Sequence, residues 1–202
     1  DLHLKGLKAL NIDLAIEAGY VVATSRALRG AHIYLGGEYG SSVLATDNVM
    51  MAAVMAKGNT VIECAACEPE VADLGDFLIK MGAKIKGHGT PTIEIEGVRQ
   101  LHGAEHKVIP DRIEAGTFIL ASLLTRGDIL IKNVLPGHLG ALIDKLSEAG
   151  VCLHREENTL RVNSKNRLKP INITTLPYPG FATDMQAQMM SLMCVTKGIS
   201  VI

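Results

Sequence analysis

Apolar and polar positions alternate along this chain with two different periods. Segments in which apolar residues recur every three or four positions predict helices, and shorter segments in which they recur at every second position predict strands. On this basis we expect helices at residues 2–10, 48–57, 69–81, 113–124, 139–149 and 185–195. We expect strands at residues 13–16, 20–24, 31–34, 84–86 and 92–96, and a strand hairpin at 151–162. The pattern therefore predicts a mixed α/β protein.

The order of these elements repeats along the chain. Three segments read as a helix, a basic residue, a glycine and then a strand, and their glycines, Gly58, Gly127 and Gly198, lie 69 and 71 residues apart. Each glycine is expected to end its helix with a positive φ, and the basic residue before it suits the negative end of the helix dipole. A second set of segments, offset from the first, reads as a helix end followed by two strands. One period is therefore helix, strand, helix, strand, turn and strand, a small α/β module that is used several times.

The two ends of the chain cut through this repeat. Asp1 enters a helix that belongs to an earlier half-module, and Ile202 stops inside an expected strand. We therefore expect these 202 residues to be an interior part of a longer chain or a shortened form of one.

A boundary between two parts of the chain is expected at residues 108–112. Pro110 closes one strand pattern, and a new helix begins near Ile113. Asp111 and Arg112 have two possible roles there. Either they cap the helix and pair with each other, or they belong to an active-site hinge.

Composition and charge argue against several function classes. The net charge is −1, and the chain has three Phe, four Tyr and no Trp, which argues against nucleic-acid binding by charge or by base stacking. No apolar run approaches the roughly 20 residues that cross a bilayer, and residues 1–20 lack the pattern of a signal peptide. We therefore expect a cytoplasmic protein that binds neither nucleic acid nor a membrane.

Two pairs of residues have spacings that occur in metal or redox sites. Cys64 and Cys67 form a Cys-x-x-Cys pair, but no second pair lies nearby, and small buried cysteines at a strand end are the alternative. His102 and His106 are four residues apart, although Gly103 argues against the helix that would bring them together, and exposed histidines are the alternative. We expect no metal ion at either pair and no disulfide framework.

A glycine-rich loop follows the strand expected at 31–34. Residues 36–42 read Gly-Gly-Glu-Tyr-Gly-Ser-Ser, and Thr46 or Asp47 is expected to cap the next helix. Glycines allow backbone N–H groups to approach a ligand, and the positive end of the following helix favours an anion. This combination suits a phosphate or diphosphate group. Because the loop matches no P-loop or dinucleotide motif, an ordinary mobile loop stays the alternative.

A second turn-rich segment, at 175–182, precedes the last expected helix. Two prolines and a glycine exclude regular structure there, and Thr183 or Asp184 is expected to cap the helix over 185–195. Asp184 would then lie at a rigid corner, in the positive field of the helix N-terminus. This pattern leaves a purely capping role and a catalytic role open.

Three stretches of the chain resemble one known family. They are AACEPEVADLGDFLIKMGAKIKG at 65–87, VIPDRIEAGTF at 108–118 and TDMQAQ at 183–188. Essentially from end to end, the chain resembles the UDP-N-acetylglucosamine 1-carboxyvinyltransferases, the enolpyruvyl transferases of bacterial peptidoglycan synthesis. The resemblance implies two similar domains of the inside-out barrel type, each built of three βαβαββ modules, with the active site in the cleft between them. Residues 1–109 and 110–202 would be incomplete parts of these two domains.

The same resemblance implies a reaction that needs no cofactor. The family transfers the enolpyruvyl group of phosphoenolpyruvate to the 3′-hydroxyl of UDP-N-acetylglucosamine and releases phosphate, through a tetrahedral intermediate. Its products serve cell-wall formation, and hence cell shape and cell division. Asp184 matches the aspartate that contacts this hydroxyl and acts as its base, which requires a carboxylate within hydrogen-bonding distance. The residues that match the family's UDP-N-acetylglucosamine contacts are Asp1, Leu2, Gly40, Ser41, Ser42, Val43 and Asp184.

The chain also departs from the family pattern. Many members carry a lysine where Gly40 stands and a glycine where Leu44 stands, so the loop at 36–41 would hold the phosphates differently. The family's general acid, a cysteine or an aspartate, and its phosphoenolpyruvate-binding arginines match no residue here, so we expect the 202 residues alone to be inactive. A non-catalytic nucleotide-sugar-binding module is the alternative. An enzyme acting on shikimate 3-phosphate is disfavoured by the stretches at 108–118 and 183–188.

Overall fold

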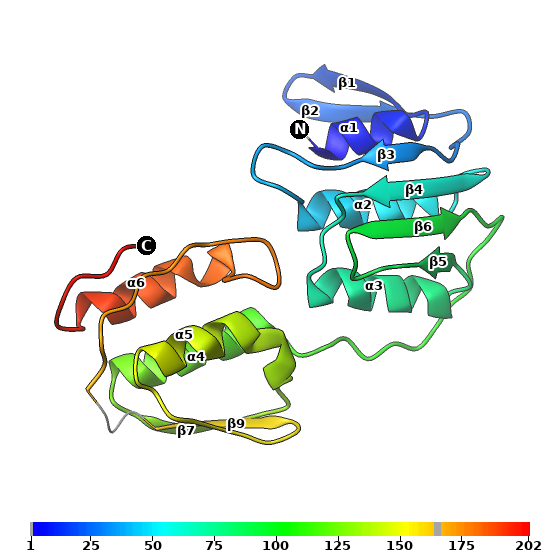
Figure 1. The fold of residues 1–202 in the computed structure, drawn as a ribbon. Coiled ribbons are helices and arrows are strands. Elements are labelled where there is room, and N and C mark those ends of the chain that lie inside the picture. The colour runs from blue at the N-terminus through cyan, green and yellow to red at the C-terminus, as the bar shows by residue number, and fades with distance from the viewer. Residues whose placement is uncertain (1, 164–166) are drawn as a thin grey trace. The chain divides into compact units, whose positions relative to one another are not determined.

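The structure is a computed structural model that describes residues 2–163 and 167–202. The chain forms two compact units, Asp1–Val108 and Ile109–Ile202, and each unit has its own hydrophobic core. Figure 1 shows the helices and strands of each unit.

The first unit begins with a helix and a separate hairpin and continues as one complete module. Helix α1 (Leu2–Ala9) precedes the antiparallel hairpin of β1 (Asp13–Glu17) and β2 (Tyr20–Thr24). The module then runs through β3 (His32–Tyr34), α2 (Val43–Ala53), β4 (Asn59–Glu63), α3 (Pro69–Lys80), β5 (Lys84–Lys86) and β6 (Thr92–Glu96). This βαβαββ order confirms the predicted module and the mixed α/β class.

The four strands of this module form one sheet in the order β3-β4-β6-β5. β3 pairs with β4 in parallel, and the other two strand pairs are antiparallel. Alternate residues of β4 and β6, among them Ile62, Ile93 and Ile95, are buried in one cluster with Val49 and Met50 of α2. The strand period of two places these side chains on a single face of the sheet, so α2 finds an apolar surface there.

The second unit contains the same elements apart from a first strand. Helix α4 (Arg112–Leu124) leads to β7 (Asp128–Lys132), the 3₁₀ helix η1 (Pro136–Leu139), α5 (Gly140–Glu148), β8 (Leu153–Arg155) and β9 (Thr159–Asn163). These strands form an antiparallel sheet in the order β7-β9-β8. The pairing of β4 with β6 starts one residue after Gly58, and the pairing of β7 with β9 starts one residue after Gly127. The two modules therefore share one strand register.

A third copy of the module begins within residues 167–202. The 3₁₀ helix η2 (Thr183–Met185) and helix α6 (Gln186–Cys194) lie between two extended segments. The backbone N–H of Ile173 donates to the carbonyl oxygen of Val201 over 2.9 Å, so these two segments lie side by side. The strand that we expected at the end of the chain is not formed as a regular strand. The order of extended segment, loop, helix and extended segment nevertheless repeats that of β3, α2 and β4.

The glycines of the repeat were expected to have a positive φ. Gly58, at +96°, and Gly198, at +134°, confirm this expectation. It is wrong for Gly127, because the preceding residue, Arg126, takes the left-handed conformation with φ +56°. The N–H of Gly127 then donates to the carbonyl oxygen of Ser122 over 2.7 Å and closes the end of α4 as a Schellman motif.

The described helices are short, and α4 has 13 residues. Within the described ranges, no helix combines the length and the apolar character that a membrane span requires.

Candidate functional site

The predicted site residues belong to both units. Leu2, Gly40, Ser41, Ser42 and Val43 lie in the first unit, and Asp184 lies in the second. Asp1 lies outside the described residues.

A tight turn of the glycine-rich loop lies against the start of α1. The N–H of Gly37 donates to the carbonyl oxygen of Gly40 over 2.9 Å, and the N–H of Gly40 donates back over 3.2 Å. A Cβ atom added to Gly37 would lie 3.2 Å from Cδ1 of Leu2, so Leu2 packs directly on this turn. Gly40 has φ +96°, a conformation that side chains rarely adopt. The structure therefore brings Leu2 and Gly40 to one place, with glycine required at the turn.

Helix α2 begins directly after this loop. Ser42 caps it, with φ −126° and ψ 123°, and its Oγ accepts from the N–H of Ala45 at 3.4 Å. The prediction that Thr46 or Asp47 is the cap is wrong. Thr46 is buried inside the first turns, where its hydroxyl donates to the Ser42 carbonyl oxygen at 2.8 Å and accepts from the N–H of Ala66 at 3.0 Å. The helix start at Val43 places the positive end of the α2 dipole at the glycine-rich loop, which suits a phosphate group.

Acidic side chains surround the second turn of α2. Burial, together with smaller contributions from the neighbouring charges of Glu70 and Glu68, raises the pKa of Asp47 to about 6. Oδ1 of Asp47 is buried and has no hydrogen-bond partner among the described residues. Glu68 is buried at the start of α3, and Glu70 lies in the first turn of that helix. This side of α2 therefore disfavours an anion, in contrast to the helix start at Ser42.

In the second unit, a closed turn leads to Asp184. The N–H of Leu176 donates to the carbonyl oxygen of Phe181 at 3.0 Å, and the N–H of Gly180 donates to that of Pro177 at 2.8 Å. A Cβ atom on Gly180 would lie 2.5 Å from the Cβ of Leu176, so the turn has room only for glycine at this position. The peptide bond between Tyr178 and Pro179 is cis.

Asp184 lies on η2 and does not cap the following helix. Helix α6 begins at Gln186 after Met185, and no side chain caps it. The prediction of a cap at Thr183 or Asp184 is therefore wrong. Thr183 and Asp184 lie in the 3₁₀ turn that ends at the buried Met185, so Met185 and not a polar residue occupies the cap position of α6. The Asp184 side chain is exposed, and within the described part of the chain its carboxylate has no hydrogen bond or ion pair, so it can accept a proton from a ligand.

Helix α4 contacts the residues that follow Asp184. A Cβ atom on Gly116 would lie 2.5 Å from Sδ of Met185, which shows how closely the methionine approaches the α4 backbone. Nε2 of Gln188 donates to Oγ1 of Thr117 at 3.0 Å. Two residues that follow Asp184, Met185 and Gln188, are thus attached to one helix.

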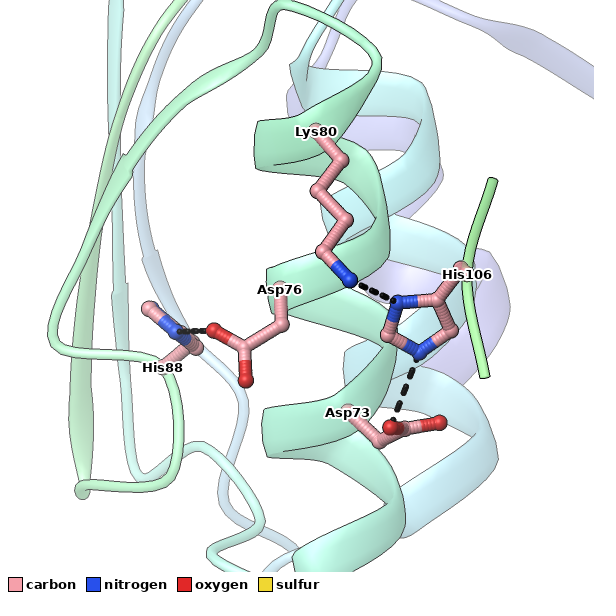
Figure 2. A network of polar contacts seen from close by, with 5 residues as sticks. All are labelled: Asp73, Asp76, Lys80, His88 and His106. Atoms are coloured by element: carbon pink, nitrogen blue, oxygen red, sulfur yellow. Dashed lines mark hydrogen bonds and ion pairs between the residues drawn. The ribbon is translucent and has the colours of Figure 1, made fainter. Parts of the chain in front are cut away.

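The two histidines with metal-site spacing do not form a pair. Nε2 of His106 lies 2.9 Å from Oδ1 of Asp73, and Nζ of Lys80 lies 3.2 Å from Nδ1 of His106 (Figure 2). Lys80 can only donate and Asp73 only accept, so this pattern fits a neutral ring with its hydrogen on Nε2. The expectation of an exposed His106 is wrong, because the ring packs beside Phe77 and its side chain is only 9% exposed. His102 is exposed, as expected.

The two cysteines of the Cys-x-x-Cys pair are free thiols. Burial raises the pKa of the Cys67 thiol, with smaller contributions from Glu68 and Cys64, so that thiol is poorly nucleophilic. Among residues 2–163 and 167–202, no three His, Cys, Asp or Glu side chains gather as metal ligands would.

The sequence did not reveal one contact at the predicted boundary. Asp111 caps α4, since its Oδ1 accepts from the N–H groups of Ile113 and Glu114 at 2.7 and 3.0 Å. Arg112, by contrast, lies over the ring of Tyr178, with 5.5 Å between Cζ and the ring centroid. In the sequence, nothing connects the tyrosine between two prolines with the arginine that begins a helix. The fold brings these two residues into contact.

The whole chain is similar to one protein family. The family model described as EPSP synthase (3-phosphoshikimate 1-carboxyvinyltransferase) matches residues 1–202. The chain is 57% identical over 202 residues to UDP-N-acetylglucosamine 1-carboxyvinyltransferase 1 of Caldanaerobacter subterraneus subsp. tengcongensis. It is 52% identical over its whole length to UDP-N-acetylglucosamine 1-carboxyvinyltransferase 2 of Carboxydothermus hydrogenoformans. The chain spans about half the length of these curated relatives, 48% of each.

Two solved structures have the same fold. The enolpyruvyl transferase NikO from Streptomyces tendae matches with a TM-score of 0.84 and 21% identity, over 98% of this chain and 49% of its own. EPSP synthase from Acinetobacter baumannii matches with a TM-score of 0.60 and 20% identity, over 86% of this chain and 41% of its own. The family model and the named relatives confirm the resemblance predicted from the sequence. The chain therefore belongs to the EPSP synthase (3-phosphoshikimate 1-carboxyvinyltransferase) family of enolpyruvyl transferases.

Proposed function

We propose that the protein transfers the enolpyruvyl group of phosphoenolpyruvate to the 3′-hydroxyl of UDP-N-acetylglucosamine and releases phosphate. The observation that carries this proposal is the identity of 57% and 52%, over the whole chain, to two relatives named for this activity. The chain spans about half the length of these relatives, so the proposal applies to the whole protein that its gene encodes.

Asp184 is the proposed base of this reaction. It accepts the proton of the sugar 3′-hydroxyl, whose oxygen bonds to C2 of phosphoenolpyruvate while C3 gains a proton. The tetrahedral adduct then loses phosphate from C2 and a proton from C3, which restores the double bond in the product. The exposed carboxylate on an anchored turn supports this role, because a base must reach its proton without a large rearrangement.

The nucleotide part of the substrate is proposed to bind at the start of α2. Its contacts would come from Leu2, the turn at Gly40, and the residues Ser41, Ser42 and Val43, with Asp1 preceding them. The positive end of α2 and the glycine turn support a diphosphate there. No lysine stands at position 40, so we propose that backbone N–H groups and the helix dipole supply most of the attraction.

The cellular setting follows from the same proposal. We propose a cytoplasmic enzyme of peptidoglycan synthesis, with roles in cell shape and cell division, and we assign the two units to parts of two enolpyruvyl transferase domains. No described feature favours a non-catalytic module or shikimate 3-phosphate as the substrate.

A calorimetric titration tests this function. The protein expressed from its own gene should bind UDP-N-acetylglucosamine saturably, and Asp184→Ala should weaken binding about tenfold because the carboxylate no longer accepts from the sugar hydroxyl. Asp144→Ala, an exposed aspartate of α5, is the matched control and should leave the Kd within about twofold.

The outcomes separate the possible functions. Saturable binding of shikimate 3-phosphate in place of the nucleotide sugar would contradict the proposed substrate. Binding of the nucleotide sugar without phosphate release from phosphoenolpyruvate would favour the non-catalytic module instead. An unchanged Kd and an unchanged rate in Asp184→Ala would remove Asp184 from the site.

A further inference from the structure

Arg112 occupies an unusual position at the first turn of α4. The residue is only 8% exposed, although arginine is among the residues that are most often at the surface. Its guanidinium group lies 5.5 Å from the centre of the Tyr178 ring, within the range of an attractive cation–π contact. A buried cation on a helix thus contacts an aromatic ring of a distant loop.

The loop that carries Tyr178 leads directly to Asp184. Its backbone is closed by the hydrogen bonds of Leu176 with Phe181 and of Gly180 with Pro177. Phe181 is buried in the core of the second unit. Because the loop is closed and attached to the core, a displacement of Tyr178 moves the short segment that ends at Asp184.

The other side of Asp184 is attached to the same helix. Met185 packs against Gly116, and Gln188 donates to Thr117. Positions 112 and 116 lie one above the other on a helix, and position 117 follows 116 in the chain, so the three contacts come from the first two turns of α4. Helix α4 therefore holds the Asp184 turn from both sides.

We propose that Arg112 is a positioning residue that acts through Tyr178 to hold the Asp184 carboxylate in place for reaction. The proposal rests on the proposed function insofar as Asp184 is the base. It differs from a role in folding alone, because a positioning residue must change the geometry of the turn and the rate of the reaction more than it changes stability.

The test uses two substitutions at each of the two residues. One substitution removes the contact between the cation and the ring, and the other keeps that contact. Arg112→Met removes the charge at similar length, and Arg112→Lys keeps a cation. Tyr178→Leu removes the aromatic ring, and Tyr178→Phe keeps it. Arg155→Met, in the exposed part of β8, is the control for loss of an arginine.

Two readouts are measured on the protein expressed from its own gene. The first is hydrogen exchange of the Leu176 and Gly180 amides, whose bonds close the loop. The second is the kcat and KM of enolpyruvyl transfer. In Arg112→Met and Tyr178→Leu we expect both amides to exchange about tenfold faster, kcat to fall about tenfold, and the KM for UDP-N-acetylglucosamine to stay within about twofold. Arg112→Lys and Tyr178→Phe should recover most of both losses.

Each result decides for or against the proposal. Unchanged amide exchange in Tyr178→Leu would overturn it, and so would a fall in kcat in Arg155→Met equal to that in Arg112→Met. If Arg112→Met does not fold, the two Tyr178 variants decide alone, because Tyr178 is only half-buried. If the amides exchange faster in Tyr178→Leu but Asp184→Ala keeps full activity, the proposed base is refuted and the structural contact stands. If amide exchange is unchanged in Tyr178→Leu and Asp184→Ala is inactive, only the positioning role of Arg112 is refuted.

Discussion

Asp47 carries a half-buried carboxyl group on the second turn of α2. Burial and two neighbouring glutamates, Glu70 and Glu68, raise its pKa from 3.8 to about 6. The folded state therefore holds the proton more tightly than the unfolded state, and the free energy of unfolding falls as the pH rises from about 4 through 6. The sign is opposite to that of an aspartate in a salt bridge.

Asp47→Asn should remove this pH dependence and stabilise the protein at pH 7.5. A shift of two units corresponds to about 3 kcal/mol for a fully buried group, and partial exposure reduces the expected gain to about 1 kcal/mol. Urea unfolding at pH 4.5 and pH 7.5 measures it, with Asp144→Asn as an exposed control. A gain of equal size at both pH values would show that the carboxyl charge is not the cause.

At the scale of single residues, the sequence predicted types of group better than their partners. The motif at 183–188 led to Asp184, and the glycine-rich loop led to Gly40. Neither motif indicated that Thr46 would bond to Ala66 or that Arg112 would contact Tyr178. Such partners come from segments that only the folded chain brings together, and one sequence holds no record of them.

At the scale of elements, helix α3 holds the irregular segment that leaves the first module. The His106 ring bonds to Asp73 and Lys80 of α3, and the N–H of His102 donates to the carbonyl oxygen of Met81 at 2.9 Å. The His106 and Asp73 side chains are 9% and 13% exposed, so water cannot readily replace either partner.

His106→Ala should therefore lower the free energy of unfolding by about 2 kcal/mol, because Asp73 would keep a buried charge without its donor. His102→Ala removes an exposed ring and leaves the backbone bond, so its effect should stay within about 0.5 kcal/mol. Denaturant unfolding of both variants measures the difference. Equal effects would show that the ring contacts contribute nothing beyond the backbone.

The hydrophobic pattern predicted where elements exist and was less accurate about where they begin. The strands at 20–24, 84–86 and 92–96 agree with β2, β5 and β6. Helix α2, by contrast, begins at Val43, five residues earlier than expected. Ser, Thr and Asp are all residue types that commonly cap helices, so Ser42, Thr46 and Asp47 were all candidates. Thr46 is instead buried, with hydrogen bonds to the Ser42 carbonyl oxygen and the Ala66 N–H, and Ser42 is the cap.

At the scale of the whole molecule, the repeat allows equivalent positions to be compared. Gly58 has a left-handed backbone after the first helix of its module, with φ +96°. In the second module the left-handed residue is Arg126, one position before the equivalent Gly127, with φ +56°. Glycine adopts this conformation without strain, whereas a side chain at that position costs about 1 kcal/mol.

Arg126→Gly should therefore raise the free energy of unfolding by about 0.5–1 kcal/mol, in spite of the entropy that glycine adds to the unfolded chain. Thermal unfolding measures the gain. Thr125→Gly, one residue earlier and with φ −90°, should be destabilising. Loss of stability in both variants would mean that the side chain of Arg126 contributes more than its backbone strain costs.

The predicted site loops occupy the same place in two copies of the module. The loop at 36–42 joins the extended segment β3 to helix α2, and the loop at 174–182 joins the segment of Ile173 to η2 and α6. Each loop is closed on itself by a bridge, between Gly37 and Gly40 in one and between Thr175 and Phe181 in the other. Gene duplication would have copied a single connection together with its scaffold. Its descendants could then change length and sequence without disturbing the strands, so that one came to suit phosphates and the other to present an acid.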